Sequence, residues 1–374
     1  MAPSIFNPKK LPKKIFIAAT RQNDGKTTIS LGLMAILKER FENIGFIKPI
    51  GQRYLVEQGY NIDEDSFLIE EIFGIKCNLK DMSPVAIEKG FTQKYINNPD
   101  REPLKKQVMD SFEKVSGGND LVVIEGTGHA GVGSVFDMSN AQVAKMLGTK
   151  VVIISAGGIG RPIDEVMLSV PLFEKAGVEI AGVIINKVQA SKYKKINELV
   201  RKGFRQHGMN VFGVIPYLKI LDMPTMEHME NELDGRRISG SDDNMLKTIN
   251  NILVATASSS VVMRHLAEKS LIITSGERDD LIRYLLKQCG RRRDKKEMLR
   301  GFILTCGFMP NRSTRKLLEK SGIPALVVQE DTYNVVTKLE DMIVKVRPGE
   351  QDKIDIITRL IHDHVDVNAL LSAM

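Results

Sequence analysis

The residues best suited by type and spacing to do chemistry lie in the stretch ATRQNDGKTTISLG, which begins at Ala19. Gly25, Lys26 and Thr27 match the second half of the phosphate-binding pattern G-x-x-x-x-G-K-[ST], whereas Thr20 stands where the pattern has its first glycine. The apolar run KIFIAAT precedes the loop and a helical pattern follows it. In such a unit, backbone N–H groups at the helix start hold phosphate oxygens, the lysine neutralises them and the threonine hydroxyl binds Mg²⁺. The stretch therefore predicts a nucleotide phosphate site.

Carboxylates that could hold the metal occur at two other places. The run LVVIEG contains Glu125 near its end, and the acidic stretch NIDEDSF contains Asp63 and Asp65. A phosphate site of this kind needs a carboxylate at the end of a second buried strand to hold the magnesium shell, which is the position of Glu125. Plainer explanations stay open, since strand-end glutamates often face solvent and an aspartate before an apolar helical run is a common helix N-cap.

A second cation, Lys48, follows the apolar run GFI. The carboxyl ends of parallel strands form the edge at which α/β proteins bind ligands, so a lysine there could stabilise charge on a transferring phosphoryl group. The pattern alone leaves open an ordinary strand-end lysine whose ammonium reaches solvent.

The stretch GTGHAG, from Gly126 to Gly131, matches the dinucleotide-binding pattern G-x-G-x-x-G. It does not belong to the first strand–helix unit, and the next apolar run, KVVIISAGG, does not end in the acidic residue that would bind a ribose. The sequence therefore argues against NAD binding. Close passage of the backbone past a phosphate or substrate explains the glycines better, with His129 exposed beside it.

The composition is that of a globular α/β protein with more than one domain. The chain has 374 residues, 43% of them hydrophobic, with 30 glycines and no tryptophan. Its net charge of +7 is scattered in short clusters without interleaved aromatic residues, which argues against nucleic-acid and membrane binding. The densest clusters are Lys9, Lys10, Lys13 and Lys14, and Arg291, Arg292, Arg293, Lys295 and Lys296.

Cysteine and histidine usage fits a reducing compartment and gives no zinc pattern. Cys77, Cys289 and Cys306 are far apart and odd in number, and His362 and His364 would point to different faces of a helix. No apolar run has membrane-spanning length, and the lysine-rich start lacks the apolar segment of a signal peptide. We therefore expect a cytoplasmic protein.

Apolar runs alternate with helical patterns in two blocks, which predicts two α/β domains. Runs typical of strands buried on both faces of a parallel sheet make up the first block: KIFIAAT, NIGFIKPI, LVVIEG, KVVIISAGG, VEIAGVIINKV and NVFGVIP. A loosened stretch around Pro224 marks a boundary, after which SLIITSGE, RGFILTCG and IPALVVQED have the pattern of further strands. The expected organisation is a basic tail over 1–13, a nucleotide-binding domain over 14–223, a smaller α/β domain over 224–350 and a terminal amphipathic helix over 351–374.

The order of these motifs resembles a known family. FIAATRQNDGKTTISLGL, GFIKPI, DEDS, LVVIEGTG and AGVIINKV resemble the dethiobiotin synthetase-like branch of P-loop proteins, which includes cobyrinic acid diamide synthases, and above all the N-terminal region of long bacterial phosphotransacetylases. SLIITSGERDDLI, GFILTCGFMP and ALVVQEDTYNVV resemble the DRTGG domain that follows there. The resemblance covers about 14–367. It implies an α/β P-loop NTPase fold with a mainly parallel sheet flanked by helices, followed by a smaller α/β DRTGG domain.

The resemblance also implies a role for each matching residue. Contacts to the nucleotide would come from Asp24, Gly25, Lys26, Thr27, Thr28 and Asn186, the last as the adenine contact. Two cations would face the phosphates and act in catalysis, Lys26 and Lys48. Three residues would be magnesium ligands, Thr27, Asp65 and Glu125. The implied cofactors are thus ATP and Mg²⁺, and a homodimer is expected because dimers are common in the family.

The loop departs from that family in ways that bear on function. Ala19 replaces a glycine, and Arg21, Gln22, Asn23 and Asp24 replace the small or hydroxyl residues that face the substrate. The charge of Asp24 would cost phosphate affinity unless Arg21 or the metal offsets it. Arg21 also lies where related partitioning ATPases carry a lysine that reaches across a dimer. We therefore do not expect dethiobiotin synthesis, nor phosphotransacetylase activity, because the sequence ends where that catalytic domain would begin.

Two functions stay open on the sequence. The first is a regulatory or nucleotide-sensing ATPase whose DRTGG domain senses a ligand, such as a small anion, or holds a dimer together. The alternative is an ATP-dependent synthetase that phosphorylates a carboxylate or carbamate, with Lys26 and Lys48 stabilising the transferring group. Kinetics separate them, because only a synthetase's ATPase should rise sharply with its substrate. A nucleic-acid-associated ATPase would instead require binding that collapses with salt.

Overall fold

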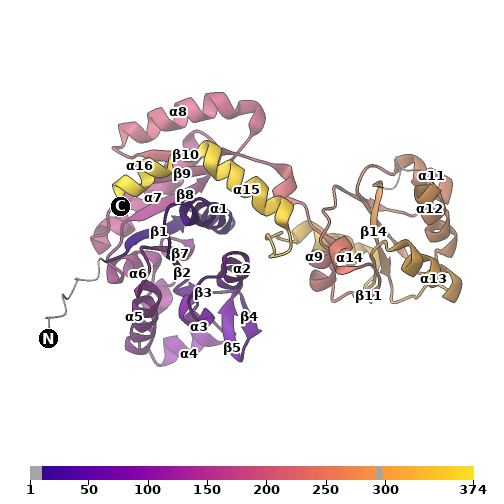
Figure 1. Cartoon of the computed structure of the whole chain (residues 1–374), viewed down its shortest axis with the longest axis horizontal. Helices are drawn as coiled ribbons and strands as arrows, with labels where there is room; N and C mark the ends of the chain where they lie inside the picture. Colours follow the sequence, from indigo (N-terminus) through magenta and orange to yellow (C-terminus); the bar gives the residue numbers. More distant parts are fainter. Residues whose placement is uncertain (1–10, 292–296) are drawn as a thin grey trace, which may run out of the picture. The chain divides into compact units, whose positions relative to one another are not determined.

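The structure is a computed structural model that describes residues 11–291 and 297–374, and the chain divides into two compact units. The first unit runs to Tyr217 and includes Ile354–Met374, and the second is Leu218–Lys353 (Figure 1). The sequence placed this division at 223–224 and set 351–374 apart. Most of the expected basic tail, 1–13, and most of the basic cluster at 291–296 lie outside the described residues.

The first unit is built on a six-stranded sheet in which every neighbouring pair is parallel. Its spatial order is β10-β9-β8-β1-β7-β2. The strands are β1 (Lys13–Ala19), β2 (Ile44–Ile47), β7 (Leu121–His129), β8 (Val151–Ala156), β9 (Ile180–Val188) and β10 (Val211–Pro216). All six coincide with apolar runs of the sequence, so the predicted parallel α/β sheet is confirmed. Burial of both faces explains why the runs are continuous rather than alternating.

Helices cover the sheet of the first unit. One face carries a core shared by α5 (Glu102–Ser116), α6 (Asn140–Met146), α7 (Gly160–Ala176) and α8 (Tyr193–Gln206). Helix α8 shows why such segments are helical, because Ile196, Val200 and Phe204 recur every four residues and form its buried stripe. Helix α1 (Lys26–Lys38) packs on the sheet outside that core and follows directly on the loop after β1.

A smaller subregion lies between β2 and β7 in the sequence. It contains an antiparallel hairpin of β4 (Tyr54–Glu57) and β5 (Tyr60–Asp63), and a short parallel pair of β3 (Ile50–Gly51) and β6 (Val85–Ala86). Its helices are α2 (Glu64–Phe73), α3 (Leu79–Met82) and α4 (Phe91–Asn97). Strand β5 leads straight into α2, which places the aspartates of NIDEDSF at a strand–helix junction.

The C-terminal segment returns to the first unit as two helices, α15 (Gln351–His364) and α16 (Val367–Ala373), where the sequence predicted one. The helical pattern breaks where Val365 forms an isolated β-bridge to Gly213 of β10 and the Asp366 N–H donates to the Phe212 carbonyl at 2.7 Å. The buried side chains of Ile357 and Ile361 pack against Gly32 of α1. The last helices therefore help to hold the helix that begins at the loop.

The second unit is a smaller three-layer α/β structure. Its sheet has the order β11-β15-β14-β13-β12, parallel except for β11. The strands are β11 (Arg236–Ser239), β12 (Asn251–Val254), β13 (Ser270–Ser275), β14 (Leu299–Thr305) and β15 (Ala325–Val327). One core holds side chains of α11 (Ser259–His265), α12 (Asp279–Arg291) and α13 (Arg312–Ser321). Another holds those of α9 (Met226–Glu232), α10 (Asp242–Met245) and α14 (Thr332–Asp341).

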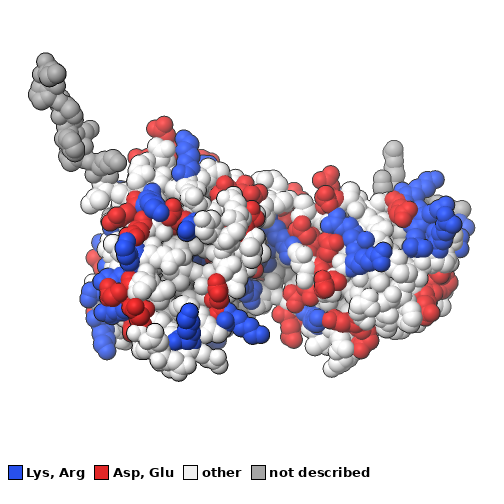
Figure 2. Space-filling view, turned by 90° about the horizontal axis from the view of Figure 1, so that it is seen from below, with Lys and Arg blue, Asp and Glu red and all other residues white. Residues whose placement is uncertain are grey.

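The surface gives no sign of one dominant charge on the face that Figure 2 shows, where basic and acidic side chains are interspersed over both units. Among the helices of the described residues, none combines the length and the apolar character needed to cross a lipid bilayer.

The contact between α1 and α15 yields a stability prediction. A Cβ atom at Gly32 would lie 2.3 Å from Ile361 Cγ1 and 3.1 Å from Ile357 Cγ2. Gly32→Val should therefore overpack this contact and lower the free energy of unfolding of the first unit by about 1–3 kcal/mol. Scanning calorimetry measures the change.

Gly290→Val is the matched control, because Gly290 lies in α12 and a Cβ atom there would have no described atom within 4 Å apart from its chain neighbours and the backbone of its own helix. Its effect should stay within about 0.5 kcal/mol. Equal melting shifts in the two variants would show that α15 does not pack on α1 as described.

Candidate functional site

The loop between β1 and α1 has the geometry of a phosphate-binding turn. Gly25 precedes the first helical residue with φ of 98°, a conformation that favours glycine. A Cβ atom there would lie 2.2 Å from Nδ2 of Asn186, so no other residue fits. The backbone N–H groups of Lys26, Thr27 and Thr28 form the first turn of α1 and have no acceptor within the helix. They are the donors that a phosphate could use.

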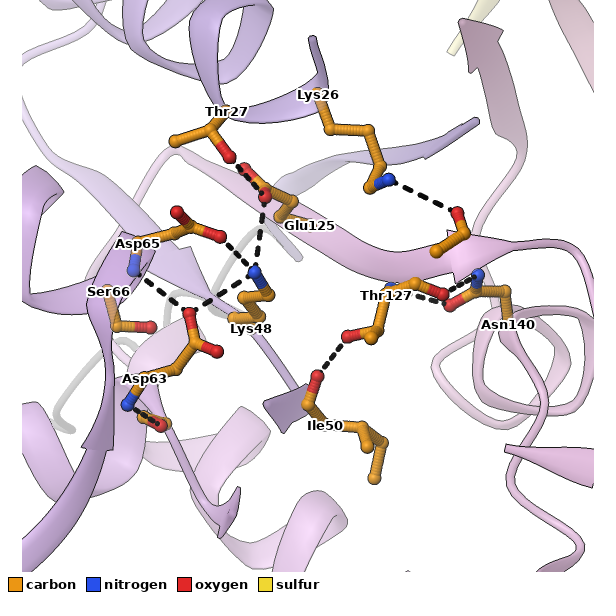
Figure 3. Close-up of polar contacts among 12 residues, drawn as sticks. Lys26, Thr27, Lys48, Ile50, Asp63, Asp65, Ser66, Glu125, Thr127 and Asn140 are labelled. Atoms are coloured by element: carbon orange, nitrogen blue, oxygen red, sulfur yellow. Dashed lines mark hydrogen bonds and ion pairs between the residues drawn. The ribbon is translucent and has the colours of Figure 1, made fainter. Parts of the chain in front are cut away.

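Lys26 is buried beside this turn. Its Nζ donates to the Gly128 carbonyl at 3.2 Å, within the part of β7 that the pattern GTGHAG occupies (Figure 3). Burial lowers the pKa of Lys26, and the Glu125 carboxylate acts in the opposite direction. The glycine-rich stretch thus continues strand β7 as far as His129, whose side chain is exposed.

Glu125 is the fully buried acid at the centre of the site. Strand β7 is paired with β1, and Oε1 of Glu125 accepts from the Thr27 hydroxyl at 3.1 Å. Among the described residues, its Oε2 has no hydrogen-bond partner of ordinary geometry, although the Ser30 hydroxyl is near enough to lower its pKa. Burial outweighs that effect and raises the pKa of Glu125. A strand-end glutamate facing solvent is therefore ruled out.

Lys48 follows β2 and is only 6% exposed, so it is not a surface lysine. Its Nζ lies 3.2 Å from Asp63 Oδ1, 3.5 Å from Glu125 Oε1 and in direct contact with Asp65 Oδ2. Burial alone would lower the pKa of Lys48, but the attraction of Asp65, Asp63 and Glu125 outweighs it and holds the pKa well above its ordinary value. Figure 3 shows the ammonium between these side chains.

The two aspartates of NIDEDSF, for which the sequence left open a helix N-cap or a metal ligand, differ in position. Asp63 is the N-cap of α2, and its Oδ1 accepts from the Asp65 N–H at 2.9 Å. Asp65, one residue into the helix, turns its carboxylate to Lys48. The N-cap keeps both carboxylates next to the Lys48 ammonium. Neither the helix N-cap interpretation nor the metal-ligand interpretation predicted this contact with Lys48.

Asp24 is buried and folds back onto its own loop. Its Oδ2 accepts from the Thr20 hydroxyl at 2.8 Å and from the Arg21 N–H at 2.7 Å. Burial raises the pKa of Asp24, which these two hydrogen bonds partly offset. The Arg21 guanidinium, one of the two groups that the sequence suggested could offset the charge of Asp24, pairs with Glu165 at 2.8 Å.

Glu165 of α7 anchors the other side of the loop, and no sequence pattern indicated it. Its Oε1 accepts from Arg161 Nε at 2.7 Å as well as from Arg21, and its Oε2 lies 3.0 Å from the Thr20 hydroxyl. Burial acts to raise its pKa, but the hydrogen bonds from Arg161 and Thr20 outweigh this and the pKa is lowered. The Ser155 hydroxyl, 3.0 Å from Thr20, completes the cluster. Glu165 lies 145 residues after Thr20, so no local pattern could have revealed it.

Asn186, at the end of β9, supports the loop directly. Its Nδ2 donates to the Asp24 carbonyl at 2.9 Å and lies against Gly25. The next residue, Lys187, borders a cavity of about 450 Å³. The other lining residues are Gly157, Gly158, Ile159, Gln189, Lys192, Lys195 and Ile196. Among the described residues, the cavity lining is cationic and contains no acidic side chain.

The residues present fit a magnesium ion that is shared with a nucleotide. Within residues 11–291 and 297–374, no three acidic, histidine or cysteine side chains are grouped so that they could hold a metal by themselves. Mg²⁺ typically takes one or two carboxylates together with phosphates and waters, and the buried Oε2 of Glu125 and the Thr27 hydroxyl suit that arrangement.

The family comparison agrees with the loop and the sheet. The model of the AAA_26 family, an AAA domain, matches residues 13–225. The chain belongs to this family. A DRTGG domain matches residues 229–342. The predicted combination of a P-loop domain and a DRTGG domain is therefore confirmed.

Curated relatives show the same two-part similarity. A phosphate acetyltransferase of Nitratidesulfovibrio vulgaris is 24% identical over 374 residues, which cover 97% of this chain and 52% of the relative. An ATP-dependent dethiobiotin synthetase of Methanococcus vannielii is 27% identical over 205 residues, which cover 54% of this chain and 92% of the relative. The chain thus spans about half the length of the phosphate acetyltransferases that it matches.

Similarity to solved structures is weaker. A putative plasmid partition protein of Borrelia burgdorferi aligns with 57% of this chain and 90% of its own, with a TM-score of 0.37 and 16% identity.

The cluster around Thr20 gives a second prediction. Thr20→Val keeps the shape of the side chain but leaves Asp24, Glu165 and Ser155 without their common hydroxyl. We expect the free energy of unfolding to fall by about 1–3 kcal/mol, because buried polar groups lose a partner. Urea unfolding measures it.

Thr337→Val is the control, since it removes an exposed hydroxyl that donates to the Tyr333 carbonyl at 3.0 Å within α14. It should change stability much less. A Thr20→Val variant as stable as this control would contradict the importance of the cluster.

Proposed function

We propose that the chain binds ATP and Mg²⁺ at the loop after β1 and acts as a regulatory or nucleotide-sensing ATPase. The observation that carries the proposal is the hydrogen bond from Thr27, at the start of α1, to the fully buried Glu125 on the neighbouring strand. A carboxylate is costly to bury, so its retention beside a phosphate-binding turn supports a metal and phosphate site.

Each loop residue has a defined task in this proposal. The N–H groups of Gly25, Lys26, Thr27 and Thr28 bind phosphate oxygens, and the Lys26 ammonium neutralises the outer phosphates. Asp24 contributes through the backbone, because its carboxylate is held by Thr20 and Arg21. These hydrogen bonds hold the negative charge of Asp24 within the loop. They therefore reduce the repulsion between this carboxylate and the phosphates that the sequence led us to expect.

Thr27, Asp65 and Glu125 are the proposed ligands of the magnesium shell. When bound, Mg²⁺ would polarise the phosphates and neutralise their charge. Lys26 and Lys48 would add positive charge on the two sides of the same phosphates. The two ammonium groups repel each other, and this repulsion is one cause of the lowered pKa of Lys26. The phosphates would relieve it.

The adenine base of the nucleotide would lie beyond Asn186, towards the cavity that Lys187 lines. Asn186 contacts the loop through Nδ2, and its Oδ1 is an acceptor suited to an exocyclic amine such as that of adenine. The cavity is large enough to receive part of a nucleotide, and some of its lining residues lie at the carboxyl ends of β8 and β9.

Regulation, rather than transfer chemistry, is supported by the second unit and by the relatives. The DRTGG match covers that unit, and the phosphate acetyltransferases resemble both units in the same order. We assign the DRTGG unit the detection of a second ligand or the holding together of a homodimer, and we place the protein in the cytoplasm.

The alternative is a synthetase that transfers a phosphoryl group from ATP to a carboxylate or carbamate. The similarity to an ATP-dependent dethiobiotin synthetase over 92% of that relative favours it. Phosphate release separates the two, because a synthetase should respond sharply to small carboxylates or amines and a sensor should not.

Substitutions of Lys26 and Glu125 test the site. Lys26→Ala should weaken ATP binding by about 100-fold or more, because a charge-assisted phosphate contact is lost. Glu125→Gln should keep ADP binding while the dependence of ATP binding on Mg²⁺ disappears. Calorimetric titration with ATP and ADP, each with and without Mg²⁺, gives both results.

Lys38→Ala is the matched control, because Lys38 is exposed at the other end of the same helix. It should leave both affinities unchanged. The proposal fails if Lys26→Ala binds ATP as tightly as this control does.

A further inference from the structure

Lys48 occupies the position in the carboxylate cluster that a cation would take, and this inference rests on the proposed nucleotide site. The ammonium contacts Asp65 and lies 3.2 Å from Asp63 and 3.5 Å from Glu125. Two of these acids, Asp65 and Glu125, are the carboxylates proposed above to hold Mg²⁺. A single oxygen of Glu125, Oε1, accepts hydrogen bonds from both the Thr27 hydroxyl and the Lys48 ammonium.

Rigid elements hold the cluster together. Lys48 follows β2, Glu125 lies on β7, and β2 and β7 are paired in the central sheet. Asp63 and Asp65 are fixed by the cap of α2, where the Asp65 N–H donates to Asp63. All four side chains are buried, so water and dissolved ions cannot screen their interactions effectively.

The net charge of the cluster determines how strongly it attracts a divalent metal ion. Three carboxylates surround the Lys48 ammonium, and the nearby Lys26 ammonium offsets only part of the remaining negative charge, at Glu125 and Asp65. A divalent cation would be attracted to these acids but repelled by the ammonium among them. The ammonium already contacts Glu125 Oε1 and Asp65 Oδ2, so a metal that used these two oxygens would displace it, and a metal held by the other oxygens would still be repelled by it.

We infer that Lys48 is the resident cation of this site and that binding of the nucleotide exchanges it for the metal. The phosphates offer Lys48 a new anionic partner, and its withdrawal frees Asp65 and Glu125 for Mg²⁺. The protein then binds the divalent cation together with the nucleotide and resists binding it alone. Such coupling would make the site respond to the metal–nucleotide complex rather than to free metal.

The inference is tested by metal binding to protein freed of nucleotide, with Mn²⁺ as the probe and electron paramagnetic resonance of free Mn²⁺ as the readout. Wild-type protein should bind Mn²⁺ weakly. Lys48→Met keeps the length of the side chain and removes the charge, so Mn²⁺ affinity should rise by about tenfold or more. Lys114→Met is the control, because it removes an exposed lysine paired with Asp81 at 2.8 Å and should change nothing.

A second variant is needed in case Lys48→Met does not fold once the ammonium between the three acids is removed. Lys48→Met combined with Asp63→Asn restores the net charge of the wild-type cluster and retains Asp65 and Glu125. It should also bind Mn²⁺ more tightly than wild type, and Mn²⁺ should raise its melting temperature. A lysine with only a structural role would lower stability on substitution without any gain in metal affinity.

The inference is overturned if neither Lys48 variant binds Mn²⁺ more tightly than the Lys114→Met control, or if wild-type protein already binds Mn²⁺ as tightly as they do. These results do not depend on ATP affinity, which the Lys26→Ala titration measures separately. Failure of the exchange and failure of the nucleotide site are therefore distinguishable.

Discussion

The buried charge of Glu125 is the constraint on which the site depends. A carboxylate at the centre of a parallel sheet is tolerated only with partners, and here they come from three directions: the Thr27 hydroxyl, the Lys48 ammonium and the nearby Ser30 hydroxyl. Thr27 ties the acid to the first turn of α1, and Lys48 ties it to β2. The phosphate-binding turn, the second cation and the aspartates of α2 thus belong to one electrostatic unit.

The unusual loop is explained by the same principle. Thr20 stands where the usual pattern has its first glycine. Its hydroxyl lies within hydrogen-bonding distance of Asp24, Glu165 and Ser155. The carboxylate of Asp24 is thereby bound within the loop, and Arg21 is drawn to Glu165. The altered residues replace the missing glycine with side-chain contacts, so the alteration is not by itself a sign of a decayed site.

Local patterns predicted the parts of the structure that depend on local physics. Continuous apolar runs indicated the strands, and the turn chemistry of Gly25 and Lys26 indicated the loop. The N-cap of α2 was among the interpretations that the sequence offered for its aspartates, and Asp63 is that cap. Glu165, the approach of Asp63 and Asp65 to Lys48, and the return of α15 to α1 were beyond such patterns, because each depends on a contact between distant segments. Strand β11 was missed in the same way, since it is stabilised by antiparallel pairing with β15, far along the chain.

The most direct test is a crystal structure of the chain with Mg²⁺ and a non-hydrolysable ATP analogue. The account predicts that the phosphates lie on the first turn of α1, that Thr27 binds the metal, and that Lys48 Nζ lies about 3 Å from a phosphate oxygen. A nucleotide bound elsewhere, or a Lys48 ammonium still held between Asp63 and Asp65 with the metal in place, would contradict it.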